Sequence, residues 1–179
     1  MKFLNYFIVS IVIYTYSFPV QAFSNPLNFT GAWVLDSKAS DKMDAIFDLQ
    51  RVSWIKKKLG ARLDAEQIIR QTPEGLTVIF DNLAGKITQN LYFDGKEHLT
   101  KNPAGHDVRL TTSWYANGKV LKVTGPAKTE DGLEGILTEV RTLSTDETTM
   151  LLTITVELPN GKRASVKRVF QRNHEDSYQ

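Results

Sequence analysis

Hydrophobic and polar residues alternate along most of the chain, which is the pattern of β-strands with one buried face. The first such segment is 28–36, where Phe29, Gly31 and Trp33 fall on one side. After Asp64 the alternation continues in nine further segments, separated by turns rich in Gly, Pro, Asn and Asp. These predicted strands are 66–71, 76–81, 86–93, 96–101, 108–115, 119–125, 133–143, 149–158 and 163–171.

One segment departs from this alternation. Between Ser40 and Leu59 the apolar residues recur at helical spacing, with Ser40 or Asp41 as the N-cap and Gly60 after the end. The apolar face shifts along the segment, so we expect two short helices with a break at 49–53. This helical region follows the first strand and is short enough to serve as a lid.

The strands are spaced 8–12 residues apart, are joined by tight turns and do not alternate with helices, which predicts an all-β antiparallel meander. A meander of about ten strands exposes two sheet edges unless it closes on itself. We therefore predict an up-and-down β-barrel with a short helical lid, spanning residues 23–172 and followed by a polar tail at 173–179. A β-sandwich is the alternative, because strand spacing does not separate the two folds.

The N-terminus has the features of a signal peptide. Lys2 is followed by an apolar run from Phe3 to Phe18, and small residues lead up to Ala22. We therefore expect residues 1–22 to be cleaved after Ala22 and the protein to be periplasmic or secreted. A membrane anchor is the alternative, but the apolar run is shorter than the roughly 20 residues that a span needs.

Composition narrows the possible functions. The chain has no cysteine, which excludes disulfides and thiol catalysis, and its formal net charge of +2 argues against a nucleic-acid partner. Its three histidines, His98, His106 and His174, lack metal-ligand spacing, and no nucleophile elbow or phosphate-binding loop is present. We therefore expect a protein that is not an enzyme, with no catalytic residue, metal or cofactor.

The segment Gly31-Ala32-Trp33 on the first strand, with basic residues on the last, resembles the signature of the calycins. The order of elements is similar to that of the fatty-acid-binding proteins. Weaker motifs at 94–97, 143–146 and 169–170 occur in the same order as in uncharacterised exported bacterial proteins described as lipocalin-like. The resemblance covers about residues 28–172 and implies a barrel that binds a small apolar ligand.

The residues of this signature also have a physical interpretation. Gly31 lets the first strand bend or lets a neighbour approach closely, and Trp33 is large enough to fill one end of a barrel. A guanidinium stacked on the indole would close that end, with Arg168 and Arg172 as the candidates. We therefore expect Gly31, Trp33 and Arg172 to be structural.

The resemblance also implies a site for a ligand head group. Fatty-acid-binding proteins hold a carboxylate with an Arg-x-Tyr on the last strand and a further Arg two strands earlier, and the matching residues are Arg168, Phe170 and Arg141. Phe170 replaces the tyrosine and removes its hydroxyl, which weakens an anionic site. Arg168 is open to either role, as a ligand contact or as the cation stacked on Trp33.

Alternation also points Phe80, Trp114 and Met150 inward, where they either line a cavity or fill the barrel. We favour a secreted barrel that carries a small hydrophobic, lipid or fatty-acid-like ligand. A filled barrel acting as an envelope interaction module, or an isomerase or cyclase, are the alternatives. The basic run Lys56, Lys57 and Lys58 is either a solvated face or a transient membrane contact.

Overall fold

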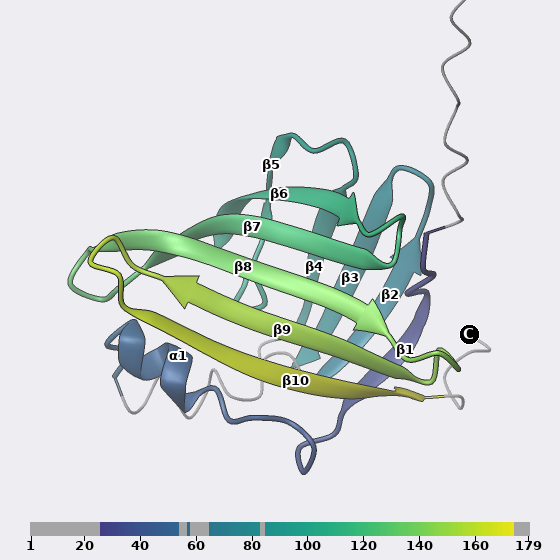
Figure 1. Ribbon diagram of the computed structural model, residues 1–179, viewed down its shortest axis with the longest axis horizontal. Helices are drawn as coiled ribbons and strands as arrows, with labels where there is room; N and C mark the ends of the chain where they lie inside the picture. The colour runs from purple at the N-terminus through teal and green to yellow at the C-terminus, as the bar shows by residue number, and fades with distance from the viewer. Residues whose placement is uncertain (1–25, 54–56, 58–64, 83–84, 174–179) are drawn as a thin grey trace, which may run out of the picture.

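The computed structural model describes residues 26–53, 57, 65–82 and 85–173. Within them, ten strands form a single antiparallel sheet that curls into a nearly closed barrel, with one helix after the first strand (Figure 1). This arrangement confirms the predicted barrel and excludes the two-sheet sandwich. The elements are β1 (Gly31–Leu35), α1 (Asp44–Leu49), β2 (Glu66–Gln71), β3 (Gly75–Asn82), β4 (Gly85–Tyr92), β5 (Glu97–Lys101), β6 (Asp107–Tyr115), β7 (Val120–Lys128), β8 (Glu134–Leu143), β9 (Thr149–Glu157) and β10 (Arg163–Asn173).

The strands follow chain order around the sheet, except that the last strand returns to the first. The order is β4-β3-β2-β1-β10-β9-β8-β7-β6-β5, so β1 pairs with β2 on one side and with β10 on the other. A strand of five residues therefore joins the two halves of the barrel.

The barrel closes differently between β4 and β5, which are the two ends of this order. Side chains cross the seam here: the backbone N–H of Asn90 donates to Thr100 Oγ1, and Gln89 Nε2 donates to the carbonyl of Lys101, both at 2.9 Å. Gln89 and Thr100 are buried. Buried polar groups need hydrogen-bond partners, and at this seam side chains supply these partners in place of a backbone ladder.

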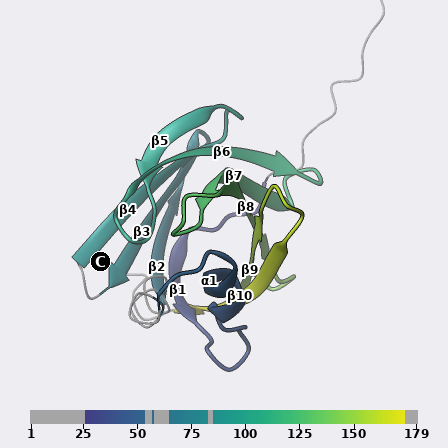
Figure 2. The same ribbon diagram turned by 90° about the vertical axis from the view of Figure 1, so that its left-hand side faces the viewer.

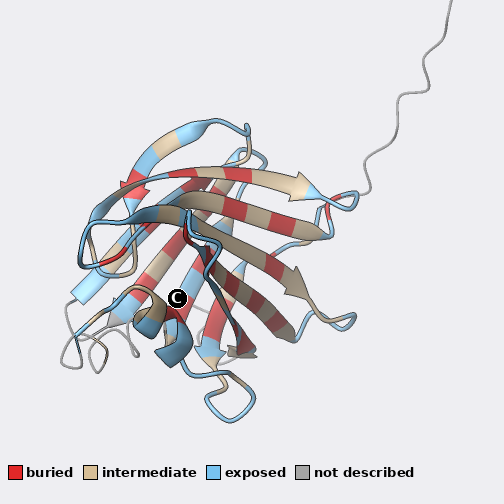
Figure 3. Ribbon diagram, turned by 60° about the vertical axis from the view of Figure 1, so that its left-hand side comes forward, coloured by how far each residue is buried: buried red, intermediate tan, exposed pale blue. Residues whose placement is uncertain are grey.

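Buried and exposed residues alternate along the strands, as Figure 3 shows. The inward residues pack tightly at the end of the barrel away from α1, where Phe29, Trp33 and Phe170 are almost fully buried. Trp114 packs there against the rings of Phe29 and Phe93, with centroids 5.9 Å and 5.2 Å apart. One half of the barrel is therefore a filled aromatic core.

The start of the helical region is corrected. Ser40 and Asp41 do not cap the helix, because they bind β10: Ser40 Oγ accepts the N–H of Val169, and Asp41 Oδ2 accepts the N–H of Lys167, both at 2.8 Å. Helix α1 begins three residues after Asp41 and ends at Leu49, where the break was expected. Of the rest of the expected helical segment, up to Leu59, the structure describes residues 50–53 and Lys57, and Lys57 is helical. The other five residues lie outside the described ones.

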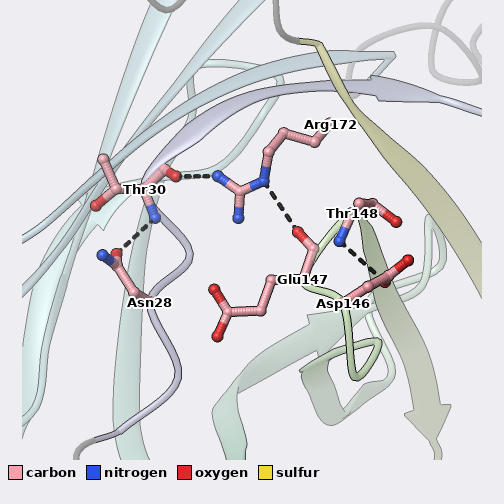
Figure 4. A pocket seen from close by; sticks show the side chains of 6 residues that line it. All are labelled: Asn28, Thr30, Asp146, Glu147, Thr148 and Arg172. Carbon is pink, nitrogen blue, oxygen red and sulfur yellow. Dashed lines mark hydrogen bonds between the residues drawn. The ribbon is translucent and has the colours of Figure 1, made fainter.

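The predicted cation over Trp33 is Arg172, at 4.4 Å from the ring centroid, and the reading of Arg168 in that role is wrong. Trp33 Nε1 donates to the carbonyl of Phe29 at 2.9 Å. Arg172 also donates to the carbonyls of Thr30 and Glu147, which fixes its guanidinium from both sides (Figure 4). The two arginines point to the same side of β10, so their parity alone did not separate them.

The expected signal peptide (1–22) lies outside the described residues, as does most of the tail (173–179), so these predictions and the domain limits stay predictions. In the part of the chain that the structure describes, no helix has the length and apolar character to cross a membrane.

Gly31 is the residue on which this closed end depends most. Its φ is +147°, and a Cβ there would lie 2.6 Å from Arg172 Nη1, which is held in place by three contacts. We expect Gly31→Ala to lower the free energy of unfolding by about 2–3 kcal/mol in urea denaturation. Gly132→Ala is the control, because Gly132 also has a positive φ but has open space around it, and it should cost about 1 kcal/mol. Equal losses would refute a role for Arg172.

Candidate functional site

A cavity of about 810 Å³ occupies the half of the barrel that α1 covers. Figure 2 looks into this end, where α1 lies across the mouth of the ring of strands. The walls are mainly apolar. The side chains of Met43, Ile46 and Phe47 on the helix side, and of Phe80, Leu137, Leu152, Ile154 and Val156 on the strands, line it.

The floor of the cavity is polar and is built around Arg141. This side chain is 1% exposed, and its Nη1 donates to Gln67 Oε1 at 3.1 Å. Gln67 lies on β2 and Arg141 on β8, so the bond joins two walls that are not neighbours in the sheet. It separates the hollow half of the barrel from the aromatic core below.

Arg141 has a second partner on its own strand. Its Nη2 lies 3.3 Å from Glu139 Oε2, and the Glu139 side chain is only 16% exposed. Arg141 Nε is buried, and its N–H has no hydrogen-bond acceptor among the described residues. The floor therefore holds one buried N–H donor without an acceptor beside an ion pair.

The predicted site residues separate into two groups. Phe80 and Arg141 line the cavity, as expected for ligand contacts. Met150 and Phe170 are fully buried in the packed core, and Trp114 packs there among aromatic rings, so these three lie outside the cavity lining. Of the two roles left open for Trp114 and Met150, lining a cavity or filling the barrel, the structure shows filling, because these inward positions lie below the floor.

Arg168 also lies outside the cavity lining. Arg168 on β10 pairs with Leu152 on β9, and Arg141 on β8 pairs with the same Leu152 from the opposite side of β9. The two arginines therefore lie two strands apart in one row of inward-facing positions. Arg168 Nη1 nevertheless donates to the carbonyl of Asp41 at 3.2 Å. It thereby helps to attach the segment before α1 to β10.

The sequence interpretation missed Glu139 and Gln67. A signal for Glu139 was present, because residues two apart on a strand share a face and Glu139 therefore points inward with Arg141. Gln67 has the same parity as the buried Ile69 on β2. The loop at 102–106 between β5 and β6, which contributes to the mouth, carried no signal of this role.

The charged side chains that line the cavity are paired. Besides the Glu139–Arg141 pair, Lys128 and Glu134 lie 3.4 Å apart at the mouth, and Asp107 pairs with Lys101 at 2.7 Å. The cavity thus combines an apolar wall with balanced charges.

A second, smaller hollow of about 260 Å³ lies at the other end, beside Arg172 (Figure 4). Its polar groups bind one another: Thr30 N–H donates to Asn28, and Thr148 N–H donates to Asp146. The hydrogen bond from Ser144 holds the pKa of Asp146 below its usual range. Across the ranges that the structure describes, no three His, Asp or Glu side chains are placed to hold a metal ion.

Solved structures share this fold. A REP1-NXSQ fatty acid transporter is similar over 80% of this chain and 95% of its own, with 16% identity and a TM-score of 0.58. A mutant of the same transporter has 17% identity over 80% of this chain and 97% of its own, again with a TM-score of 0.58. No protein-family model and no curated protein sequence matches the chain.

Human cRBP IV, a cellular retinol-binding protein, is similar over 83% of this chain and all of its own, with 15% identity and a TM-score of 0.58. At these identities the similarity establishes the fold alone, an antiparallel barrel of the kind that these proteins share. The predicted calycin barrel is therefore confirmed as a fold. The resemblance to exported bacterial lipocalin-like proteins stays a prediction.

The Arg141–Gln67 bond can be tested through stability. We expect Gln67→Met to lower the free energy of unfolding by about 1–3 kcal/mol, because it leaves a buried guanidinium N–H without its acceptor. Gln50→Met is the matched control, since Gln50 also lines the cavity but its bond to Lys128 is exposed, and it should cost under about 0.5 kcal/mol. Urea denaturation measures both, and a loss as small for Gln67 as for Gln50 would argue against the bridge.

Proposed function

We propose that this protein binds a small hydrophobic ligand inside the barrel, a lipid or fatty-acid-like molecule with its polar head near Arg141. The cavity is the observation that carries this proposal. Its volume of about 810 Å³ lies within the roughly 300–1,000 Å³ of known ligand pockets. Its walls are mainly apolar and its polar groups lie at the floor and at the mouth, which suits a ligand with an extended apolar part and a polar end.

The comparisons support the same proposal. Structures with this fold include proteins described as a fatty acid transporter and as a retinol-binding protein. Fold alone does not fix function, so the cavity and its chemistry have to carry the argument. An open cavity favours a carrier over a filled interaction module, and the one histidine that lines it, His106, lies at the mouth, away from the floor. We therefore propose binding and not catalysis.

We also propose that the protein is exported, with residues 1–22 as a cleaved signal peptide and the periplasm or the exterior as its location. Of the basic run 56–58 the structure describes only Lys57, which forms an ion pair with Asp48 of α1. A transient membrane contact through Lys56, Lys57 and Lys58 remains part of the proposal, and it would have to compete with this pair.

Filling the cavity should abolish binding. The double variant Leu137→Trp with Ile154→Trp places two larger side chains into open space. We expect its affinity for a pyrene-labelled dodecanol, measured by fluorescence titration, to fall at least about tenfold, while the free energy of unfolding changes by about 1 kcal/mol or less.

Ile136→Trp is the control for this experiment, because Ile136 neighbours Leu137 on β8 but is 60% exposed on the outer surface. It should bind the probe like the wild type. Binding that survives the double variant would place the ligand outside the barrel. A wild type that binds no probe and carries no lipid in native mass spectrometry would contradict the proposed function.

Export has a separate test. When the full chain is expressed in a bacterium and recovered from the periplasm, N-terminal sequencing should begin at Phe23, because cleavage is expected after Ala22. Ala22→Lys should block processing and leave the precursor in the cell. A soluble cytoplasmic protein that retains Met1 would refute the signal peptide.

A further inference from the structure

A carboxylate and a guanidinium lie together at the cavity floor, where both side chains are largely shielded from water. Glu139 and Arg141 both point inward from β8, and their side chains are 16% and 2% exposed. Their charged atoms are 3.3 Å apart. In such surroundings opposite charges interact more strongly than at a surface, and a charge without a partner is costly. The cation therefore already has its anion before any ligand arrives.

A carboxylate ligand would disturb this balance. Placed at Arg141, it would bring a second negative charge close to Glu139 and would have to share one guanidinium with it. Like charges brought together in a buried site repel strongly, and this repulsion disfavours the wrong partner. The next cation on the inner row, Arg168, lies outside the lining and binds the carbonyl of Asp41.

The other charges around the cavity do not compensate for this repulsion. Lys128 is the second cation of the lining, and it lies at the mouth paired with Glu134. Among the described lining residues, no positive charge is left over to receive an anionic head. An anionic head group at Arg141 would therefore compete with a carboxylate that is already paired with it.

An uncharged oxygen fits the floor better. Arg141 Nε carries a buried N–H that has no hydrogen-bond partner among the described residues, although the other two nitrogens of the guanidinium are bound. A buried donor of this kind is stabilised by any acceptor that reaches it. A hydroxyl, carbonyl or amide oxygen that reaches this N–H after a shift of the Arg141 side chain would satisfy it without adding charge.

We infer that Glu139 determines the ligand class: the cavity takes hydrophobic molecules with an uncharged oxygen-bearing head group in preference to carboxylates. This inference rests on the proposed function, since it specifies the ligand of the same cavity. Glu139 acts by neutralising Arg141, and specificity arises because the wrong ligand meets a repulsive group.

The test compares two probes that differ only at the head: pyrene-labelled dodecanol and pyrene-labelled dodecanoate, titrated by fluorescence at neutral pH. The wild type should bind the alcohol more tightly. Glu139→Gln keeps the shape and a hydrogen bond to Arg141 but leaves the cation without its anion. We expect it to shift the ratio of the two affinities toward the carboxylate by about tenfold or more.

Glu97→Gln is the matched control, because it removes the same charge from an ion pair of the same length, with Arg109 at 3.3 Å, which is exposed and lies outside the cavity lining. It should change the ratio by less than about twofold. Arg141→Gln is the opposite variant, because it removes the cation and leaves the negative charge of Glu139 without its partner. We therefore expect it to shift the ratio of the two affinities further toward the alcohol. It also keeps the inference testable if Glu139→Gln does not fold.

The outcomes separate the two claims. If both probes bind the wild type but the ratio is unchanged in Glu139→Gln, or is unmoved in Arg141→Gln, the role of Glu139 is refuted and the binding function stands. A wild type that prefers the carboxylate also refutes it. If neither probe binds, the proposed function itself fails.

Discussion

The guanidinium of Arg172 lies on the indole of Trp33, and this contact joins the first strand of the barrel to the last. β1 has only five residues, yet it links β2 and β10, which belong to opposite halves of the sheet order. The stack works only because Gly31 has no side chain where Arg172 Nη1 lies, and because two backbone carbonyls hold the guanidinium. Cation–π contacts of this kind contribute about 0.5–2 kcal/mol. The barrel is therefore also closed by the backbone pairing of β1 with β10 and by the hydrogen bonds around the stack.

With that end closed and filled by aromatic side chains, the remaining inner positions cannot all be packed. A ten-stranded barrel encloses more space than its inward side chains fill, and the excess collects under α1 as the cavity. The bond between Arg141 and Gln67 marks the boundary. Below it the residues serve packing, and above it they surround open volume. The same strands thus provide a rigid core at one end and a site at the other.

Most of the fold could be predicted from alternation and turns, because a strand with one buried face leaves a pattern of period two. β2 was predicted with its observed bounds, whereas β7 continues past Pro126 to Lys128. Proline is tolerated there because it lies beyond the residues of β7 that pair with β6, so its missing N–H breaks no ladder on that side.

The site was harder to predict than the fold. Parity places Arg141, Arg168 and Met150 all inward, but the level at which the packed core gives way to the cavity depends on register across ten strands. A single sequence does not contain that register.

The ion pair at the floor is better explained by selection of a ligand than by stability. Burying two charges costs desolvation energy, and replacing such a pair by apolar residues is often neutral or stabilising. The surrounding cavity wall is apolar, so an apolar floor would have been compatible with the fold and with a hydrophobic ligand. Keeping Glu139 next to Arg141 leaves the guanidinium able to donate a hydrogen bond from Nε while its charge is cancelled. A lone arginine would attract anions, and a lone apolar residue would recognise no head group. The pair does neither, and that combination gives the cavity floor polarity without net charge.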